Sequence, residues 1–274
     1  MPMIPSIGRA LKASPIAPLL RRYDREKRAR QYRDMLTNGR MFPVDAREAI
    51  VADYRAVCLD TMLCIAGVMN LEIAVRTVAE RSIPGAFVEC GTWRGGALAY
   101  IARAAKRLGL QDRPIYGFDS FEGLPEPVER DGDAVIKRSA ELRGAPPSTA
   151  GALSGGPWCR ATYESCAAVL AQTAYPPQLL NIRKGWFQHT LPSAKTEIGP
   201  IAILRLDGDL YESTKVCMTT LYDNVAPGGF LIIDDYGVFP GCRRATDEFW
   251  AARKIATPLH YVQRSIRYVI KPTG

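Results

Sequence analysis

Histidines and paired cysteines are scarce in this sequence, which has two histidines and seven cysteines without a CxxC pair. The scarcity argues against a zinc cluster and against a disulfide framework, so we expect buried free thiols. No apolar run is long enough to cross a bilayer, and prolines interrupt residues 1–20, where a secretory signal has a continuous apolar region. We therefore expect a globular cytoplasmic protein that has no membrane partner.

The chain is long enough to bury a full core, with 274 residues of which 47% are hydrophobic. Its composition predicts one domain over residues 46–274, preceded by a basic, proline-punctuated arm over residues 1–45. Part of the net charge of +8 is concentrated in residues 21–33, RRYDREKRARQYR. Such a run is typical of a solvated helix or an oligomer arm rather than of nucleic-acid binding. We expect a homo-oligomer that does not bind nucleic acid.

Strand-like and helix-like segments alternate over most of the domain. An apolar face over Val51 to Met69 predicts an amphipathic helix, and a second helix is expected over Leu71 to Arg81. Strands are then predicted at residues 86–89, 115–118, 179–182 and around 202–206 and 229–233, with helices between them. Residues 242–254 predict a last helix, and residues 259–263 and 266–270 a closing hairpin. The fold class is α/β, with a doubly wound and mostly parallel sheet.

A glycine-containing turn follows the first predicted strand, at Gly91, Gly95 and Gly96. Glycines at such a turn let the backbone approach a ligand closely, and the helix that follows favours negative charge. Trp93 occupies the second glycine position of a GxGxxG motif, which disfavours a nicotinamide cofactor. Asp119 ends the next strand, where α/β nucleotide-binding proteins keep an acid for ribose hydroxyls. A helix cap is the alternative role for Asp119.

Acidic residues follow the last two parallel strands: Asp207 and Asp209 after the first, Asp234 and Asp235 after the second. The segment between them has helical periodicity and is expected to end at Pro227 and Gly228. A right-handed crossover brings both strand ends to one edge of the sheet, where unpaired carboxylates would repel each other. The arrangement therefore predicts a site for a hard divalent cation such as Mg²⁺.

Two further segments are expected near this edge. Residues 124–160 are rich in proline and glycine and have little periodicity, which indicates a lid or a disordered loop rather than a core element. Trp186 and Phe187 follow the strand near residue 180 and either stack on a purine or close the core.

Five sequence blocks together resemble the macrocin O-methyltransferase family. They are VECGTWRGG, GFDSFEGLPEP, KGWFQHTLP, LRLDGDLYEST and GGFLIIDDYG, and the resemblance spans residues 60–250. It implies a Rossmann-like class I methyltransferase with a seven-stranded sheet, a C-terminal antiparallel hairpin and an N-terminal helical arm. It also implies an enzyme that transfers a methyl group from S-adenosylmethionine to a hydroxyl, often on a sugar of a bacterial secondary metabolite.

The same resemblance implies roles for individual residues. Asp207, Asp234 and Asp235 map onto Mg²⁺ ligands. The residues expected around S-adenosylmethionine are Thr61, Met62, Glu89, Gly91, Thr92, Arg94, Gly95, Asp119, Ser120, Phe121, Trp186, Phe187, Gln188 and Asp207.

The general base is left open by the sequence. The chain is more distantly similar to the catechol O-methyltransferase group, in which a lysine three residues after the first metal acid serves as base; here that residue is Leu210. His189 stands where many family members have an acid. Asp207 is the first candidate for the base, with Asp209 and His189 as alternatives.

Other functions remain as alternatives at this level. The acceptor is a small molecule, with a sugar hydroxyl expected and a phenolic or other hydroxyl as the alternative. A nicotinamide-dependent oxidoreductase and a non-enzymatic protein that binds nucleic acid through residues 21–33 are the alternatives from other classes.

Overall fold

The computed structural model of the chain describes residues 47–146 and 151–273. The chain divides into two compact units, Met1–Arg55 and Ala56–Gly274. The predicted arm over residues 1–45, including the basic run at 21–33, lies outside the described residues. In the described part, no helix has the length and apolar character needed to cross a membrane. All seven cysteines are free thiols, and five of them are buried.

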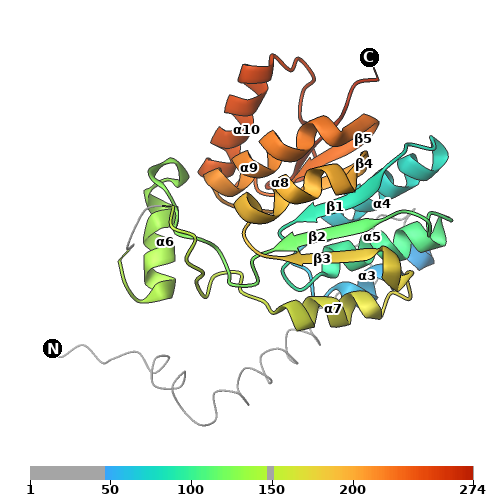
Figure 1. Cartoon of the computed structure of the whole chain (residues 1–274), viewed down its shortest axis with the longest axis horizontal. Coiled ribbons are helices and arrows are strands. Elements are labelled where there is room, and N and C mark those ends of the chain that lie inside the picture. The colour runs from blue at the N-terminus through green and yellow to red at the C-terminus, as the bar shows by residue number, and fades with distance from the viewer. Residues whose placement is uncertain (1–46, 147–150, 274) are drawn as a thin grey trace, which may run out of the picture. The chain divides into compact units, whose positions relative to one another are not determined.

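A seven-stranded sheet forms the centre of the second unit, in the order β3-β2-β1-β4-β5-β7-β6 (Figure 1). Pairing is parallel from β3 to β5, whereas β7 is antiparallel to both β5 and β6. This confirms the predicted mostly parallel sheet and the C-terminal hairpin. The strands are β1 (Ala86–Cys90), β2 (Ile115–Asp119), β3 (Leu180–Lys184), β4 (Ile201–Leu206), β5 (Val225–Ile233), β6 (His260–Tyr261) and β7 (Arg267–Ile270).

Helices cover both faces of the sheet (Figure 1). One face carries α4 (Ile65–Glu80), α5 (Gly96–Arg107) and α7 (Tyr163–Ala171); the other carries α8 (Phe187–Ile198), α9 (Tyr211–Leu221) and α10 (Pro240–Arg253). The short helices are α3 (Glu48–Val57), η1 (Glu129–Asp131), η2 (Pro177–Leu179) and η3 (Tyr222–Asn224). Because helices cover both faces of the sheet, the central strands β1 and β4 are mostly apolar and are buried at every position.

The register of the central strands decides which residues meet at the sheet edge. Cys90 pairs with Leu206, and Leu206 pairs with Ile233. The residues that follow these three, Gly91, Asp207 and Asp234, therefore leave the sheet at the same level. Two backbone hydrogen bonds continue the ladder there, from Asp207 N to the Cys90 carbonyl at 2.8 Å and from Asp234 N to the Leu206 carbonyl at 2.9 Å.

The predicted helix over Val51 to Met69 is wrong in its extent, because residues 58–64 separate α3 from α4. The Asp60 carbonyl accepts a hydrogen bond from Gly96 N at 2.9 Å, and the Thr61 hydroxyl accepts one from Leu63 N at 3.1 Å. The first bond ties the connecting segment to the start of α5, and the second lies within the segment, where Met62 is 65% exposed. Apolar residues at helical spacing therefore belong here to two helices and a loop.

A further boundary differs from the predictions. Pro227 and Gly228 do not end the helix between the acidic strands; they lie inside β5, which begins at Val225. Proline is accepted there because Pro227 is exposed, next to an irregularity in the pairing of β4 with β5.

The insertion, residues 124–160, contains a helix that was not predicted, α6 (Asp133–Arg143), which lies beyond the carboxyl ends of the strands (Figure 1). The Arg143 guanidinium donates to the carbonyls of Leu124, Ser154 and Gly155 at 2.8 to 3.2 Å. It also forms an ion pair with the buried Glu126 at 3.1 Å. One side chain thus joins both ends of the insertion, which supports α6 despite its weak periodicity.

Candidate active site

A cavity of about 560 Å³, including its open mouth, lies at the carboxyl ends of the strands. The lining comes from the loops after β1 to β4, from the insertion and from the α3–α4 connection. The lining residues are Met62, Gly91, Trp93, Asp119, Ser120, Gly123, Leu124, Pro125, Cys159, Trp186, Phe187, Gln188, Asp207, Gly208, Asp209 and Ser213.

The turn after β1 brings Gly91 and Trp93 to the cavity. Gly91 has φ +94°, and a Cβ at this position would lie 1.8 Å from the Asp207 carbonyl oxygen. Only glycine fits this crossing of two strand ends. Trp93 also has positive φ (+47°), and its N–H donates to the Asp119 carboxylate at 2.8 Å. The turn is therefore held in an unusual backbone path beside the start of α5.

Asp119 joins two loops at the end of β2. Its Oδ2 accepts the Trp93 N–H, and its Oδ1 accepts the Phe121 N–H at 2.7 Å. Burial raises the pKa of Asp119, although these N–H groups lower it. Each carboxylate oxygen has a second lone pair, so the side chain can accept further hydrogen bonds from a ligand in the cavity.

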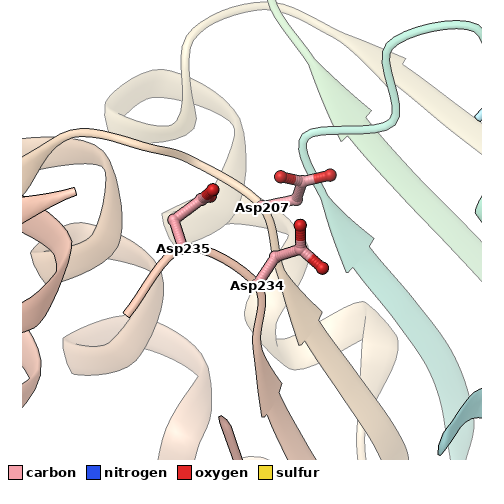
Figure 2. A group of neighbouring side chains, drawn as sticks. All are labelled: Asp207, Asp234 and Asp235. Carbon is pink, nitrogen blue, oxygen red and sulfur yellow. The ribbon is translucent and has the colours of Figure 1, made fainter. Parts of the chain in front are cut away.

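Three carboxylates meet at the ends of β4 and β5, and we call Asp207, Asp234 and Asp235 the carboxylate rim. Each offers one oxygen, and these atoms all lie within 4.8 Å of one another. Figure 2 shows the three side chains together at the ends of the two strands. An all-oxygen donor set of this kind suits a hard divalent cation.

A buried arginine, which the sequence interpretation missed, contacts this rim from below. The Arg205 guanidinium is 2.8 Å from Asp207 Oδ2 and 2.6 Å from Asp234 Oδ1, and it is 2.5 Å from Glu89 Oε1 on β1. The Arg205 side chain is only 3% exposed. Asp207 and Asp234 therefore do not face each other unpaired, as the sequence interpretation assumed. The available signal was a charged residue inside the otherwise apolar strand β4.

One guanidinium does not balance all the acids at this edge. Burial and the charge of Asp207 raise the pKa of Glu89 to about 7 even though Arg205 lowers it. Burial likewise raises the pKa of Asp234 to about 6. Burial and then the neighbouring Asp209 and Asp207 raise the pKa of Asp235 well above its usual range. The excess of negative charge is what a bound cation would relieve.

Asp209 lies between the rim and the cavity. It has φ +56°, a backbone conformation that is uncommon for a residue with a side chain. Its N–H donates to Asp235 Oδ2 at 3.2 Å, and its side chain lines the cavity. Burial and the charges of Asp207 and Asp234 raise the pKa of Asp209 well above its usual range.

The insertion is fixed to the start of α9 by Asp131. Its Oδ1 accepts the Tyr211 N–H at 2.7 Å, and its Oδ2 accepts the Val128 N–H at 2.8 Å. The Tyr211 hydroxyl donates to Glu248 at 2.6 Å, and the Arg130 guanidinium lies over the Tyr211 ring. The α9 helix has no side-chain cap of its own, so the insertion supplies one directly after the Asp207–Asp209 loop.

Comparison with known proteins identifies the family. The sequence model of the macrocin O-methyltransferase (TylF) family matches residues 20–145 and 177–270. The chain belongs to the macrocin O-methyltransferase family. Family membership confirms the predicted resemblance and makes the protein an O-methyltransferase. It decides against the alternatives of a nicotinamide-dependent oxidoreductase and of a protein without enzymatic activity.

Named relatives of the family match most of the chain. It is 34% identical to a demethyldecarbamoylnovobiocin O-methyltransferase of Streptomyces niveus, over 85% of this chain and 79% of the relative. It is 37% identical to 8-demethyl-8-(2,3-dimethoxy-alpha-L-rhamnosyl)-tetracenomycin-C 4'-O-methyltransferase of Streptomyces olivaceus, over 73% of this chain and 70% of the relative.

Solved structures show the same fold. The O-methyltransferase NovP superimposes with a TM-score of 0.66 at 33% identity, over 78% of this chain and 82% of NovP. The calicheamicin methyltransferase CalS11 superimposes with a TM-score of 0.60 at 19% identity, over 98% of each chain. The predicted class I methyltransferase fold of this family member is confirmed.

The structure brings eight of the residues expected around S-adenosylmethionine to the cavity. They are Met62, Gly91, Asp119, Ser120, Trp186, Phe187, Gln188 and Asp207. The other expected residues are not among those that line it: Thr61, Glu89, Thr92, Arg94, Gly95 and Phe121. Arg94 supports the lining instead, since it donates to the Leu59 carbonyl and lies over the Trp93 ring.

His189 is not brought to the cavity. It is exposed on α8 and lines a separate hollow with Arg183, Lys184 and Glu197. Of the three candidates for the general base, the structure therefore brings Asp207 and Asp209 to the cavity and leaves His189 outside it.

Proposed function

We propose that this protein is a metal-dependent O-methyltransferase that transfers a methyl group from S-adenosylmethionine to a sugar hydroxyl of a secondary metabolite. The observation that carries the proposal is that one cavity is bounded by both Asp119 and Asp207. Asp119 lies at the end of β2 and suits a ribose, and Asp207 belongs to the carboxylate rim. The acceptor class is supported by the relatives, one of which is named for a rhamnosyl-tetracenomycin substrate.

The cofactor half of the cavity fits S-adenosylmethionine. When bound, this molecule supplies a methyl carbon whose bond to sulfur breaks as the bond to the acceptor oxygen forms. Asp119 would accept hydrogen bonds from the ribose hydroxyls with its remaining lone pairs. The Gly91 backbone would lie against the methionyl part, because no side chain blocks its approach. Trp186 and Phe187 would contact the adenine, to which their rings offer flat apolar faces.

The carboxylate rim, which reaches the cavity through Asp207, fits Mg²⁺, with Asp207, Asp234 and Asp235 as ligands. A bound divalent cation lowers the pKa of a hydroxyl that it contacts and fixes its direction. The role of the rim residues is to hold their oxygens in one place, and the backbone hydrogen bonds after β4 and β5 restrain them there. A sugar with two neighbouring hydroxyls suits such a site, because both oxygens can be oriented at once.

Asp209 is the best candidate for the general base. Asp207 is already hydrogen-bonded to Arg205 and is needed in the rim, and His189 lies outside the cavity. Asp209 lines the cavity, so that its carboxylate can accept a proton from the acceptor hydroxyl at one of its oxygens. The strained backbone at Asp209 fits a functional position.

The insertion would bind the acceptor. Leu124, Pro125 and Cys159 form a largely apolar wall of the cavity, whose position is restrained by Arg143 and by Asp131. Residues 46–274 are the methyltransferase domain of this proposal, with residues 1–45 as an arm that serves a cytoplasmic homo-oligomer.

The direct test is to incubate the protein with S-adenosylmethionine, Mg²⁺ and a panel of glycosylated acceptors, and to identify methylated products by mass spectrometry. Excess EDTA should abolish turnover, and Asp119→Asn should weaken binding of S-adenosylmethionine in calorimetry. Full turnover in EDTA would remove the metal from the mechanism, and an unchanged cofactor affinity in Asp119→Asn would remove Asp119 from the ribose.

The base is tested by a pair of variants. Asp209→Asn should lower turnover by about 10²- to 10⁴-fold, the usual contribution of a general base, while His189→Ala should retain wild-type turnover. The reverse result would show that His189 reaches the reacting hydroxyl and that Asp209 does not.

A further inference from the structure

Arg205 and Glu89 are buried charges at the centre of the sheet whose role the methyl-transfer reaction does not by itself explain. Both side chains are almost inaccessible, at 3% and 0% exposure. Taking two charges out of water costs several kcal/mol per ion. Apolar residues at these two positions would therefore stabilise the fold at least as well as the buried ion pair does. Their position points to another role, because Arg205 also contacts two members of the carboxylate rim.

The guanidinium has a separate partner on each of three adjacent strands. Nη1 contacts Glu89 on β1 and Asp207 after β4, and Nη2 contacts Asp234 after β5. A planar fork can bond several carboxylates at fixed angles, which the single ammonium of lysine cannot do. Arg205 therefore bridges the carboxylates of Asp207 and Asp234.

The contacts leave oxygens of the rim available. Arg205 bonds Asp207 through Oδ2 and Asp234 through Oδ1, so each carboxylate keeps its other oxygen. Asp235, the third member of the rim, accepts the Asp209 N–H. The Arg205 guanidinium contacts the same two carboxylates that would bind a divalent cation. Its positive charge therefore repels a cation bound there.

We propose that Arg205 is the permanent counter-cation of the carboxylate rim. Its positive charge draws Asp207 and Asp234 together whether or not a divalent cation is bound, and because the same charge repels that cation, it keeps the affinity of the rim for the cation moderate. The inference rests on the proposed function, since it assumes that the rim binds a cation. Its consequence is that the site is assembled before the metal arrives and that the metal remains exchangeable.

The test compares the full-length variants Glu89→Gln and Glu89→Gln/Arg205→Met, freed of metal and kept at pH 8. The glutamine substitution avoids leaving a buried carboxylate without its partner, so the difference between the two proteins reports on Arg205. Free Mn²⁺ is measured by electron paramagnetic resonance during titration, and thermal unfolding is followed in EDTA and in saturating Mn²⁺.

The double variant should bind Mn²⁺ about tenfold or more tightly than Glu89→Gln, which corresponds to about 1.4 kcal/mol. Its unfolding midpoint should rise more on adding Mn²⁺, because the metal then replaces the lost counter-cation. Arg205→Lys keeps the charge without the fork and should fall between the wild type and the double variant. If the double variant does not fold, Arg205→Lys is compared with the wild type instead. The decrease in unfolding midpoint that Arg205→Lys causes should then be smaller in Mn²⁺ than in EDTA.

Equal or weaker Mn²⁺ binding without Arg205 would overturn the proposal, as would a stability loss that is the same in EDTA and in Mn²⁺. Loss of an outer partner that merely orients metal ligands typically weakens affinity by about 10- to 100-fold, so the two roles give opposite signs. A wild-type protein that binds no Mn²⁺ would instead contradict the cation site itself.

Discussion

Substituting Gly91 by alanine tests whether the crossing of β1 and β4 positions the metal site. The new Cβ would lie 1.8 Å from the Asp207 carbonyl oxygen, whereas ordinary contacts begin at 3.4 Å. One of the two backbones must therefore move by more than an ångström, and the neighbouring atom is main chain that cannot rotate away. A displacement of about 1 Å at a reacting group can lower a rate by about 100-fold.

The matched control is Gly109→Ala. Gly109 also has positive φ (+78°), but a Cβ there meets nothing within 4 Å. It should lose about 1 to 2 kcal/mol of stability from backbone strain alone and keep wild-type ligand binding. Gly91→Ala should lose more stability and should also bind Mn²⁺ about 10-fold or more weakly, since Asp207 is displaced.

Urea denaturation measures the stability of both variants, and Mn²⁺ titration and calorimetry with S-adenosylmethionine measure their sites. These assays do not require the acceptor to be known. If Gly91→Ala bound Mn²⁺ like the wild type, the packing of Gly91 against Asp207 would not hold the rim in place.

Two further outcomes are expected. Because burial raises the pKa of Glu89 to about 7 and of Asp234 to about 6, both carboxyls bind protons more tightly in the folded protein than in the unfolded chain. The free energy of unfolding of the metal-free protein should therefore fall as the pH rises from about 4 to about 8, because these carboxyls then lose their protons. Mg²⁺ should raise the free energy of unfolding more at pH ~8 than at pH ~5. If urea denaturation showed that Mg²⁺ stabilises the protein equally at the two pH values, this explanation from the raised pKa values would be wrong. Asp131→Ala should cost about 1 to 2 kcal/mol by removing the cap of α9 and should expose the insertion to proteolysis, whereas Asp133→Ala, at an exposed position, should do neither.

The strands were accessible from the sequence because their signals are local. Apolar runs such as residues 201–206 are typical of strands buried on both faces, and acids directly after them mark strand ends. The handedness of parallel crossovers then brought Asp207 and Asp234 to one edge without any knowledge of packing. Helix limits were less certain, since Met62 has helical spacing but lies in a loop.

The contacts that assemble the site were not accessible in the same way. Asp131 caps a helix 80 positions further along the chain, through the Tyr211 N–H. Nothing in the composition of the insertion marks Asp131 among its other charged residues. His189 shows the opposite error: its sequence neighbours belong to the site, but His189 lines a separate hollow.

The sequence by itself determined the alternating fold, the glycine turn at Gly91 and the acids that end β2, β4 and β5, because strand period and strand termination are properties of a few consecutive residues. Only the tertiary structure decided how those acids are balanced. Glu89 and Arg205 are 116 positions apart and meet because β1 and β4 are neighbours in the sheet. The burial that makes a charge expensive, and the partner that offsets it, both arise only when the strands are placed side by side.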